Sequence, residues 1–273
     1  MNTYGLAIPG CAFLLVSLLF PAFAPGKSDD PQTQSAAPPT SATAARPSND
    51  LSAEEQGRLY LARKEYVLAE GVFRRLTQEQ PKSSLYWNEL GISLHNQTRL
   101  DDALKCYQKS ARLNPQYPDA LNNQGTIWYA KKKYTKAIRV YKKAIAIRDS
   151  YAPFYLNLGY AYFGEKDYQE SIASFRKALQ LDPDAFETSK SRLGTIIQDR
   201  SLSTDRGRFY FLLAKSFAES GNVERCVVYL KKARDEGFQE LNSVKSDPSF
   251  KTVLKDPAVQ EVLAPKPPET AQP

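Results

Sequence analysis

The sequence predicts an all-α protein, a solenoid of stacked helix-turn-helix units preceded by a disordered segment. The main observation is an internal repeat whose copies start at Asp50, Ser84, Pro118 and Ala152, with the same interval between each start and the next. Each copy reads as two helices whose apolar faces meet, and one such hairpin cannot bury its own core. The composition agrees, because 16 Tyr and 13 Phe supply a stacked core and the single Met and few Val indicate little sheet.

Residues 1–24 resemble a secretory signal peptide. An apolar run from Cys11 to Phe20 is followed by Pro-Ala-Phe-Ala, which supplies the small residues of an A-x-A cleavage site. No Lys or Arg precedes the run, and Pro25 would follow the cut. An uncleaved membrane anchor is an alternative, since residues 5–24 match the roughly 20 residues that a span needs, and a buried helix is another. We expect an exported, periplasmic or secreted protein, or else one anchored in the inner membrane with its repeats outside the cytoplasm.

Residues 25–49 are predicted to be a disordered linker. They are rich in Pro, Ala, Ser and Thr and have no helical period. With almost no large apolar side chain, such a segment cannot offset the entropy lost on ordering.

Residues 50–83, 84–117, 118–151 and 152–185 form four repeats with matching side chains at matching positions. The first two carry Gly57, Tyr60, Ala69, Phe73 and Pro81, then Trp87, Leu90, Gly91, Ala103, Tyr107 and Pro115. The next two carry Gly125, Trp128, Ala137, Tyr141 and Ala144, then Tyr155, Leu158, Gly159, Tyr162, Phe175, Ala178 and Pro183. Glycine and alanine let two helices approach, the aromatic ring fills the space beside them, and proline ends the second helix.

This pattern resembles the tetratricopeptide repeat, Trp-x2-Leu-Gly-x2-Tyr followed by Ala-x3-Phe and Pro, in a unit of about 34 residues. The departures are Asp149 at a proline position and Ser171 at an alanine position. The resemblance, to exported bacterial members of the family, implies a right-handed superhelix whose first helices line a concave groove. It also implies a protein that binds other proteins.

After Pro183 the repeat loses its phase. The next matching set of side chains starts near Gly207, so 186–206 is an insertion, predicted to be an extra helix or a degenerate half-repeat. Residues 207–240 form a fifth repeat. In 241–273, Asp247-Pro248 and Asp256-Pro257 are typical helix starts. We expect capping helices there, followed by a frayed tail.

The positive charge is concentrated in one repeat. Residues 118–151 hold eight Lys and Arg against two Asp, a net charge of +6 out of +7 for the whole chain. The basic residues on its second helix and the preceding turn are Lys132, Lys133, Lys136, Arg139, Lys142 and Lys143. They predict a solvated outer face, or else a surface for an acidic protein or for anionic lipid. Nucleic acid is not expected, because no reader motif is present.

Catalysis is not expected. The chain has one His, no phosphate-binding glycine loop and no Cys/His cluster, so no enzyme activity, metal or cofactor is predicted. Cys106 and Cys226 belong to repeats too far apart for a disulfide within one molecule.

The predicted partner site is the inner facet of the first helices of the second, third and fourth repeats. Its residues are Asn88, His95, Asn122, Asn123, Thr126, Tyr129, Asn157, Tyr160 and Phe163. Asn123 and Asn157 resemble the asparagines with which some family members hold a peptide backbone, because an amide both donates and accepts. Alternatively, these asparagines bond neighbouring helices and the aromatic rings complete the core. Glu54 and Glu89 occupy the facet where a carboxylate clamp would need cations, so that type of site is not expected.

The prediction is therefore a non-enzymatic scaffold of the cell envelope that binds a protein or an extended peptide in the groove. The alternative is an envelope-assembly component that uses its basic convex face. The sequence predicts neither the partner nor the oligomeric state.

Overall fold

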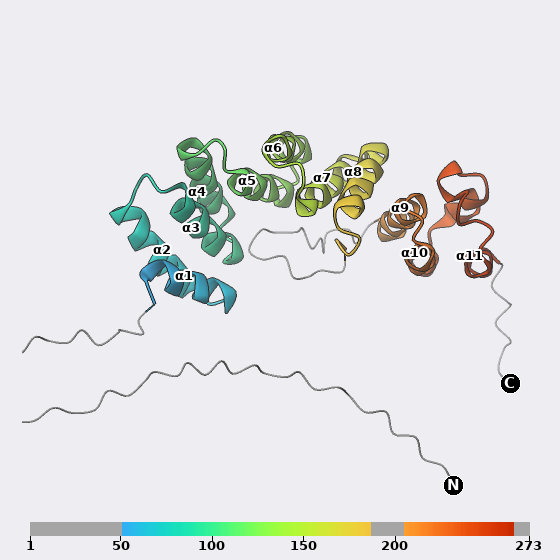
Figure 1. Ribbon diagram of the computed structural model, residues 1–273, viewed down its shortest axis with the longest axis horizontal. Coiled ribbons are helices and arrows are strands. Elements are labelled where there is room, and N and C mark those ends of the chain that lie inside the picture. The colour runs from blue at the N-terminus through green and yellow to red at the C-terminus, as the bar shows by residue number, and fades with distance from the viewer. Residues whose placement is uncertain (1–50, 187–204, 265–273) are drawn as a thin grey trace, which may run out of the picture. The chain divides into compact units, whose positions relative to one another are not determined.

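The structure, a computed structural model, describes residues 51–186 and 205–264, and every regular element in these two ranges is a helix (Figure 1). The predicted all-α fold is thereby confirmed. The predicted signal peptide or anchor, the linker, nearly all of the insertion and the last nine residues lie outside the described residues. None of the described helices has the length and apolar character needed to cross a bilayer.

The helices from α1 to α10, within the described ranges, form five hairpins. They are α1 (Ala53–Ala62) with α2 (Tyr66–Glu79), α3 (Ser84–Asn96) with α4 (Leu100–Leu113), α5 (Pro118–Ala130) with α6 (Tyr134–Ile147), α7 (Ala152–Glu165) with α8 (Tyr168–Leu181), and α9 (Arg206–Glu219) with α10 (Val223–Asp235). The second helix of each hairpin also packs on the first helix of the next, and α3, α5 and α7 contact one another in succession. Successive pairs thus stack as tetratricopeptide-like units.

The turn inside each hairpin has the same backbone geometry. Lys64, Thr98, Lys132 and Lys166, each one repeat after the last, all have positive φ, between 55° and 66°. In the fifth hairpin the equivalent turn contains Gly221, with φ 76°. A left-handed residue reverses the chain direction over few residues, and side chains other than glycine adopt it at a cost.

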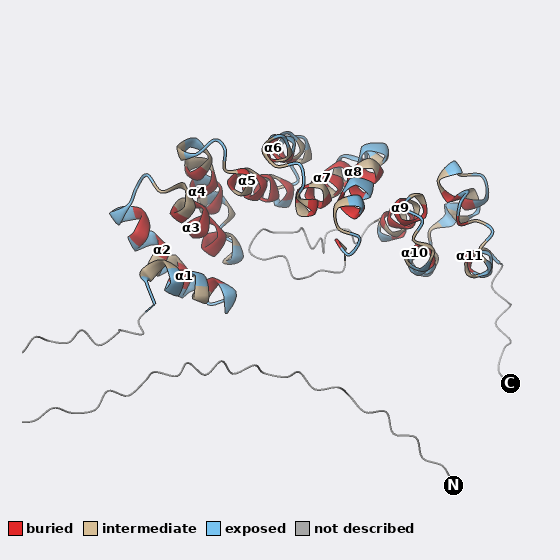
Figure 2. Ribbon diagram, viewed as in Figure 1, coloured by how far each residue is buried: buried red, intermediate tan, exposed pale blue. Residues whose placement is uncertain are grey.

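The core follows the predicted pairing of glycine with an aromatic ring. A Cβ placed on Gly91 would lie 2.5 Å from a ring atom of Tyr107, and one on Gly125 would lie 2.4 Å from Tyr141. Both tyrosine rings are fully buried. Buried residues line the faces where helices meet, and exposed residues lie on the outer turns (Figure 2). The glycines are therefore required for close helix packing.

Short helices cover the end of the array. η2 (Gln239–Lys245), η3 (Pro248–Phe250) and α11 (Pro257–Leu263) pack on α9 and α10. Asp247 and Asp256 accept hydrogen bonds from backbone N–H groups of Ser249 and Ala258, at 3.0 and 2.8 Å. Phe250 is fully buried. Without this cap, the apolar side of the fifth hairpin would face water.

Candidate functional site

Four asparagines of the predicted groove form one buried chain of hydrogen bonds. Asn157 Nδ2 donates to Asn122 Oδ1 at 2.9 Å, and Asn123 Nδ2 donates to Asn88 Oδ1 at 3.0 Å. Asn122 Nδ2 lies 3.5 Å from Asn123 Oδ1 and closes the chain. No more than 2% of any of these side chains is exposed. The chain links α3, α5 and α7.

This arrangement corrects the expectation that the asparagines face an open groove. Asn123 and Asn157 are fully buried, so their amides bond neighbouring helices, which is the alternative that the sequence also allowed. Thr126 is buried as well, and its hydroxyl donates to the carbonyl of Asn123 at 2.7 Å. Buried polar groups require such partners because leaving them unpaired is costly.

The three aromatic residues predicted to contact a partner also belong to the core. Tyr129 and Phe163 are each only 6% exposed. The half-buried ring of Tyr160 stacks on Phe209, with 5.5 Å between ring centroids and 22° between planes. Phe209 belongs to α9, beyond the insertion where the sequence loses its phase, so the repeat pattern could not have indicated this contact.

His95 is a packing residue in the structure. Its half-buried ring lies edge-on to Tyr107, with centroids 6.5 Å apart. Burial lowers the pKa of His95 to about 4, so the ring is neutral at pH 7. No group of His, Cys, Asp and Glu within the described ranges could hold a metal ion.

The predicted basic residues lie on one exposed surface, which we call the α6 cation surface. It comprises Lys132, Lys133, Lys136, Arg139, Lys142 and Lys143, all exposed. The Nζ atoms of Lys133 and Lys136 lie 5.9 and 4.8 Å from the ring centroid of Trp128. Within the described part of the chain, none of the six forms an ion pair, whereas the neighbouring Lys131 pairs with Asp101. This surface therefore has positive charge available for a partner.

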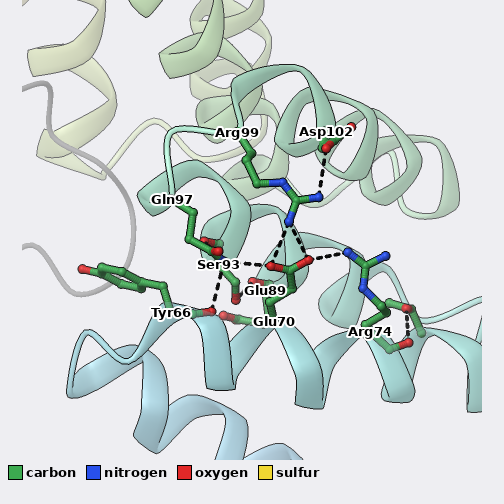
Figure 3. Close-up of polar contacts among 9 residues, drawn as sticks. Tyr66, Glu70, Arg74, Glu89, Ser93, Gln97, Arg99 and Asp102 are labelled. Atoms are coloured by element: carbon green, nitrogen blue, oxygen red, sulfur yellow. Dashed lines mark hydrogen bonds and ion pairs between the residues drawn. The ribbon is translucent and has the colours of Figure 1, made fainter.

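The sequence reasoning missed a polar cluster centred on Glu70 (Figure 3). Its carboxylate accepts hydrogen bonds from Arg74, from Arg99 at 2.8 Å and from Gln97 at 2.9 Å. Burial alone would raise the pKa of Glu70, but these donors hold it below the usual value. Arg99 also bonds Asp102 at 3.0 Å. The cluster joins α2 to the turn before α4 and to α4 itself, so it holds the first hairpin on the second. Only the i, i+4 spacing of Glu70 and Arg74 was visible in the sequence.

Comparison with known proteins supports the repeat assignment. Profiles described as tetratricopeptide repeat match residues 84–117 and 152–185, and one described as TPR repeat matches 125–166. The peroxisomal targeting signal receptor of Kluyveromyces lactis is 34% identical over 67 residues, which are 24% of this chain and 12% of the receptor. The chain thus spans about an eighth of that relative's length.

Two solved structures have segments similar to this chain. MamA 41-end from Desulfovibrio magneticus RS-1 is 18% identical, with a TM-score of 0.48, over 67% of this chain and 92% of that one. The first TPR of Spaghetti (RPAP3), solved with an HSP90 peptide, is 25% identical, with a TM-score of 0.37, over 40% of this chain and 90% of that one.

Proposed function

We propose that this chain, three segments of which match tetratricopeptide-repeat profiles, is a non-enzymatic scaffold that binds a partner protein. Arrays of such repeats present large, rigid surfaces built from many units, which suits recognition of another polypeptide. Placement in the cell envelope, either released or anchored through residues 5–24, is part of the proposal and is supported by the composition of residues 1–24 alone.

We propose the α6 cation surface as the docking site, with an acidic protein segment as its partner. One observation carries this assignment: six exposed cations gather around α6 and none has an ion-pair partner among the described residues. Elsewhere, long-range pairs such as Arg176–Glu219 and Arg206–Glu236, at 3.0 and 3.1 Å, use their charge within the array. Cations gathered on one face attract an anionic partner and speed its association.

Peptide binding on the first-helix facet is the competing possibility. It would require the asparagine chain to open, because Asn123 and Asn157 are fully buried and bonded to other asparagines. Binding of a peptide at that facet would not depend on the positive charge of α6.

The decisive experiment reverses the charge of Lys136, Arg139 and Lys143 by substitution with Glu. We expect the wild-type protein to bind a labelled polyglutamate peptide, and the triple variant to lose at least about tenfold in affinity, because three attractive charges become repulsive. Fluorescence anisotropy at low and moderate salt measures both affinities. Binding should weaken as salt rises, since exposed charges are screened.

The matched control carries the same charge change elsewhere, as Lys177→Glu, Lys231→Glu and Lys251→Glu, which are exposed residues of other helices or turns. This control should bind polyglutamate nearly as well as wild type. If both triple variants lost the same affinity for polyglutamate, the loss would come from the change in net charge, and α6 would not be the binding site. Co-sedimentation with phosphatidylglycerol vesicles, without polyglutamate binding, would instead indicate a lipid partner.

A further inference from the structure

The buried asparagine chain follows a fixed register. Asn123 bonds Asn88 and Asn157 bonds Asn122, so each donor reaches an acceptor 35 residues earlier, on the first helix of the preceding repeat. The same step of 35 residues, taken from the second repeat to the first, leads from Glu89 of α3 to Glu54 of α1, whose charge acts on Glu89. At this place two carboxyl groups occupy the positions that amides occupy in the following repeats.

Glu89 is buried, with only 7% of the residue exposed. Among the described residues, no group hydrogen-bonds its Oε2 atom. Glu54 has partners of its own, since Tyr86 donates to its Oε2 at 2.9 Å and Arg58 pairs with its Oε1 at 3.0 Å. A neutral carboxyl group can donate as an asparagine amide does, whereas an ionised one only accepts.

Charged and titratable groups from several elements surround Glu89. They are Glu54 and Arg58 of α1, Tyr107 of α4, Tyr117 before α5, and Asp119 of α5. Arg58 is exposed and already paired with Glu54, while Asp119 is paired with Arg148 at 2.7 Å. Burial therefore has the largest effect and raises the pKa of Glu89 to about 7, with Glu54 and Asp119 acting in the same direction and Arg58 opposing them.

We propose that the proton on Glu89 controls the contact between α1 and α3: neutral Glu89 keeps α1 against α3, where Tyr86 bonds Glu54, and ionised Glu89, repelled by Glu54, loosens α1. This inference goes beyond the proposed interaction and does not depend on it. It describes a pH-sensitive contact built into the N-terminal end of the repeat array.

The direction of the effect follows from the raised pKa. The stabilising contribution of neutral Glu89 is complete below the ordinary carboxyl value of 4.5 and is lost as the pH rises through about 7. The chain has one histidine, His95, whose pKa is lowered to about 4 by burial. A change between pH 5.5 and 8.5 that disappears in Glu89→Gln can therefore be traced to Glu89.

Hydrogen exchange with mass spectrometry on the full chain tests the proposal. We expect the protection factors of amides in residues 53–62, corrected for the intrinsic pH dependence of exchange, to fall about tenfold to thirtyfold between pH 5.5 and 8.5. Amides of α9 and α10 should show no such change. Glu89→Gln keeps the size and can donate at every pH, so it should hold the protection of α1 constant.

Two further variants separate this contact from general effects. Glu65→Gln removes an exposed carboxylate from the first hairpin, between α1 and α2. This variant should retain the wild-type pH dependence. Glu54→Gln removes the repelling charge and should shift the midpoint to lower pH. Constant protection of α1 in the wild type, or a pH dependence that survives in Glu89→Gln, would overturn the proposal.

Discussion

The side chain of Asn123 bonds amides on both sides, donating to Asn88 at 3.0 Å and lying 3.5 Å from the amide nitrogen of Asn122. Three consecutive first helices are therefore connected through buried amides, with Asn157 at the far end. Such a chain stabilises only if every member is paired, because a buried amide without a partner retains the cost of its lost hydration. It also favours one register between repeats, since a displaced helix would leave amides unpaired.

Replacement of Asn123 by alanine should therefore destabilise the array. We expect the free energy of unfolding to fall by about 1–3 kcal/mol, because Asn88 loses a donor and Asn122 an acceptor. Urea denaturation followed by circular dichroism measures this change. The control is Asn96→Ala, since Asn96 is exposed and its amide donates to a carbonyl of its own helix. An equal effect of the two substitutions would show that the buried chain adds nothing.

At the scale of the element, each of the first four hairpins depends on a glycine that lets an aromatic ring lie against the first helix. In the second hairpin the pair is Gly91 and the fully buried Tyr107. In the fourth it is Gly159 and Phe175, where an added Cβ would lie 2.4 Å from a ring atom. The glycine on the second helix of the first hairpin, Gly71, differs, because nothing lies within 4 Å of the position of its Cβ.

These two environments predict opposite effects of the same substitution. Gly91→Ala should lower the free energy of unfolding by roughly 1–3 kcal/mol, because the methyl group overlaps a ring that cannot move away. Gly71→Ala should raise it by about 0.5–1 kcal/mol, because alanine favours an exposed helix position where the space is open. Thermal or urea melts of the two variants measure these changes in the free energy of unfolding. If both substitutions stabilised the protein, the ring of Tyr107 would have to shift more easily than its burial indicates.

At the scale of the whole molecule, the array consists of units that bury apolar surface mainly against their neighbours. In the part of the chain that the structure describes, the fifth hairpin is followed by η2, η3 and α11, which cover it with buried residues such as Phe250 and Val259. The charged pair Lys215–Asp247, at 2.9 Å, connects α9 to the residue that caps η3. Terminal units of repeat proteins need covers of this kind.

Removal of residues 241–273 should therefore weaken the fifth hairpin selectively. We expect faster hydrogen exchange in α9 and α10, and a lower midpoint of thermal unfolding, because the apolar side chains under Phe250 become exposed. Exchange in α3 and α4 serves as the internal control and should not change. Unchanged protection of α9 and α10 in the shortened chain would contradict a capping role.

The helical repeats could be predicted from the sequence because their signals are local and periodic. Gly91, Tyr107 and Pro115 recur at fixed spacing, and each acts within its own hairpin or on the next one. The basic run was equally visible, and its residues lie exposed around α6. The candidate groove was less predictable. An asparagine such as Asn123 has the same sequence neighbours whether it faces solvent or a second asparagine.

By itself, then, the sequence determined the helix-turn-helix repeats, the pairing of glycine with an aromatic ring inside the first four hairpins, and the charge of α6. Only the tertiary structure decided that Asn88, Asn122, Asn123 and Asn157 are buried together and that Tyr160 stacks on Phe209. It also decided that Glu89 is buried within the influence of Glu54 and Asp119, with one oxygen that no described group bonds. The physical reason is the distance along the sequence over which each interaction acts. Helix formation and hairpin packing depend on residues within one repeat, whereas the burial and ionisation of a polar side chain depend on the helices that approach it from other repeats.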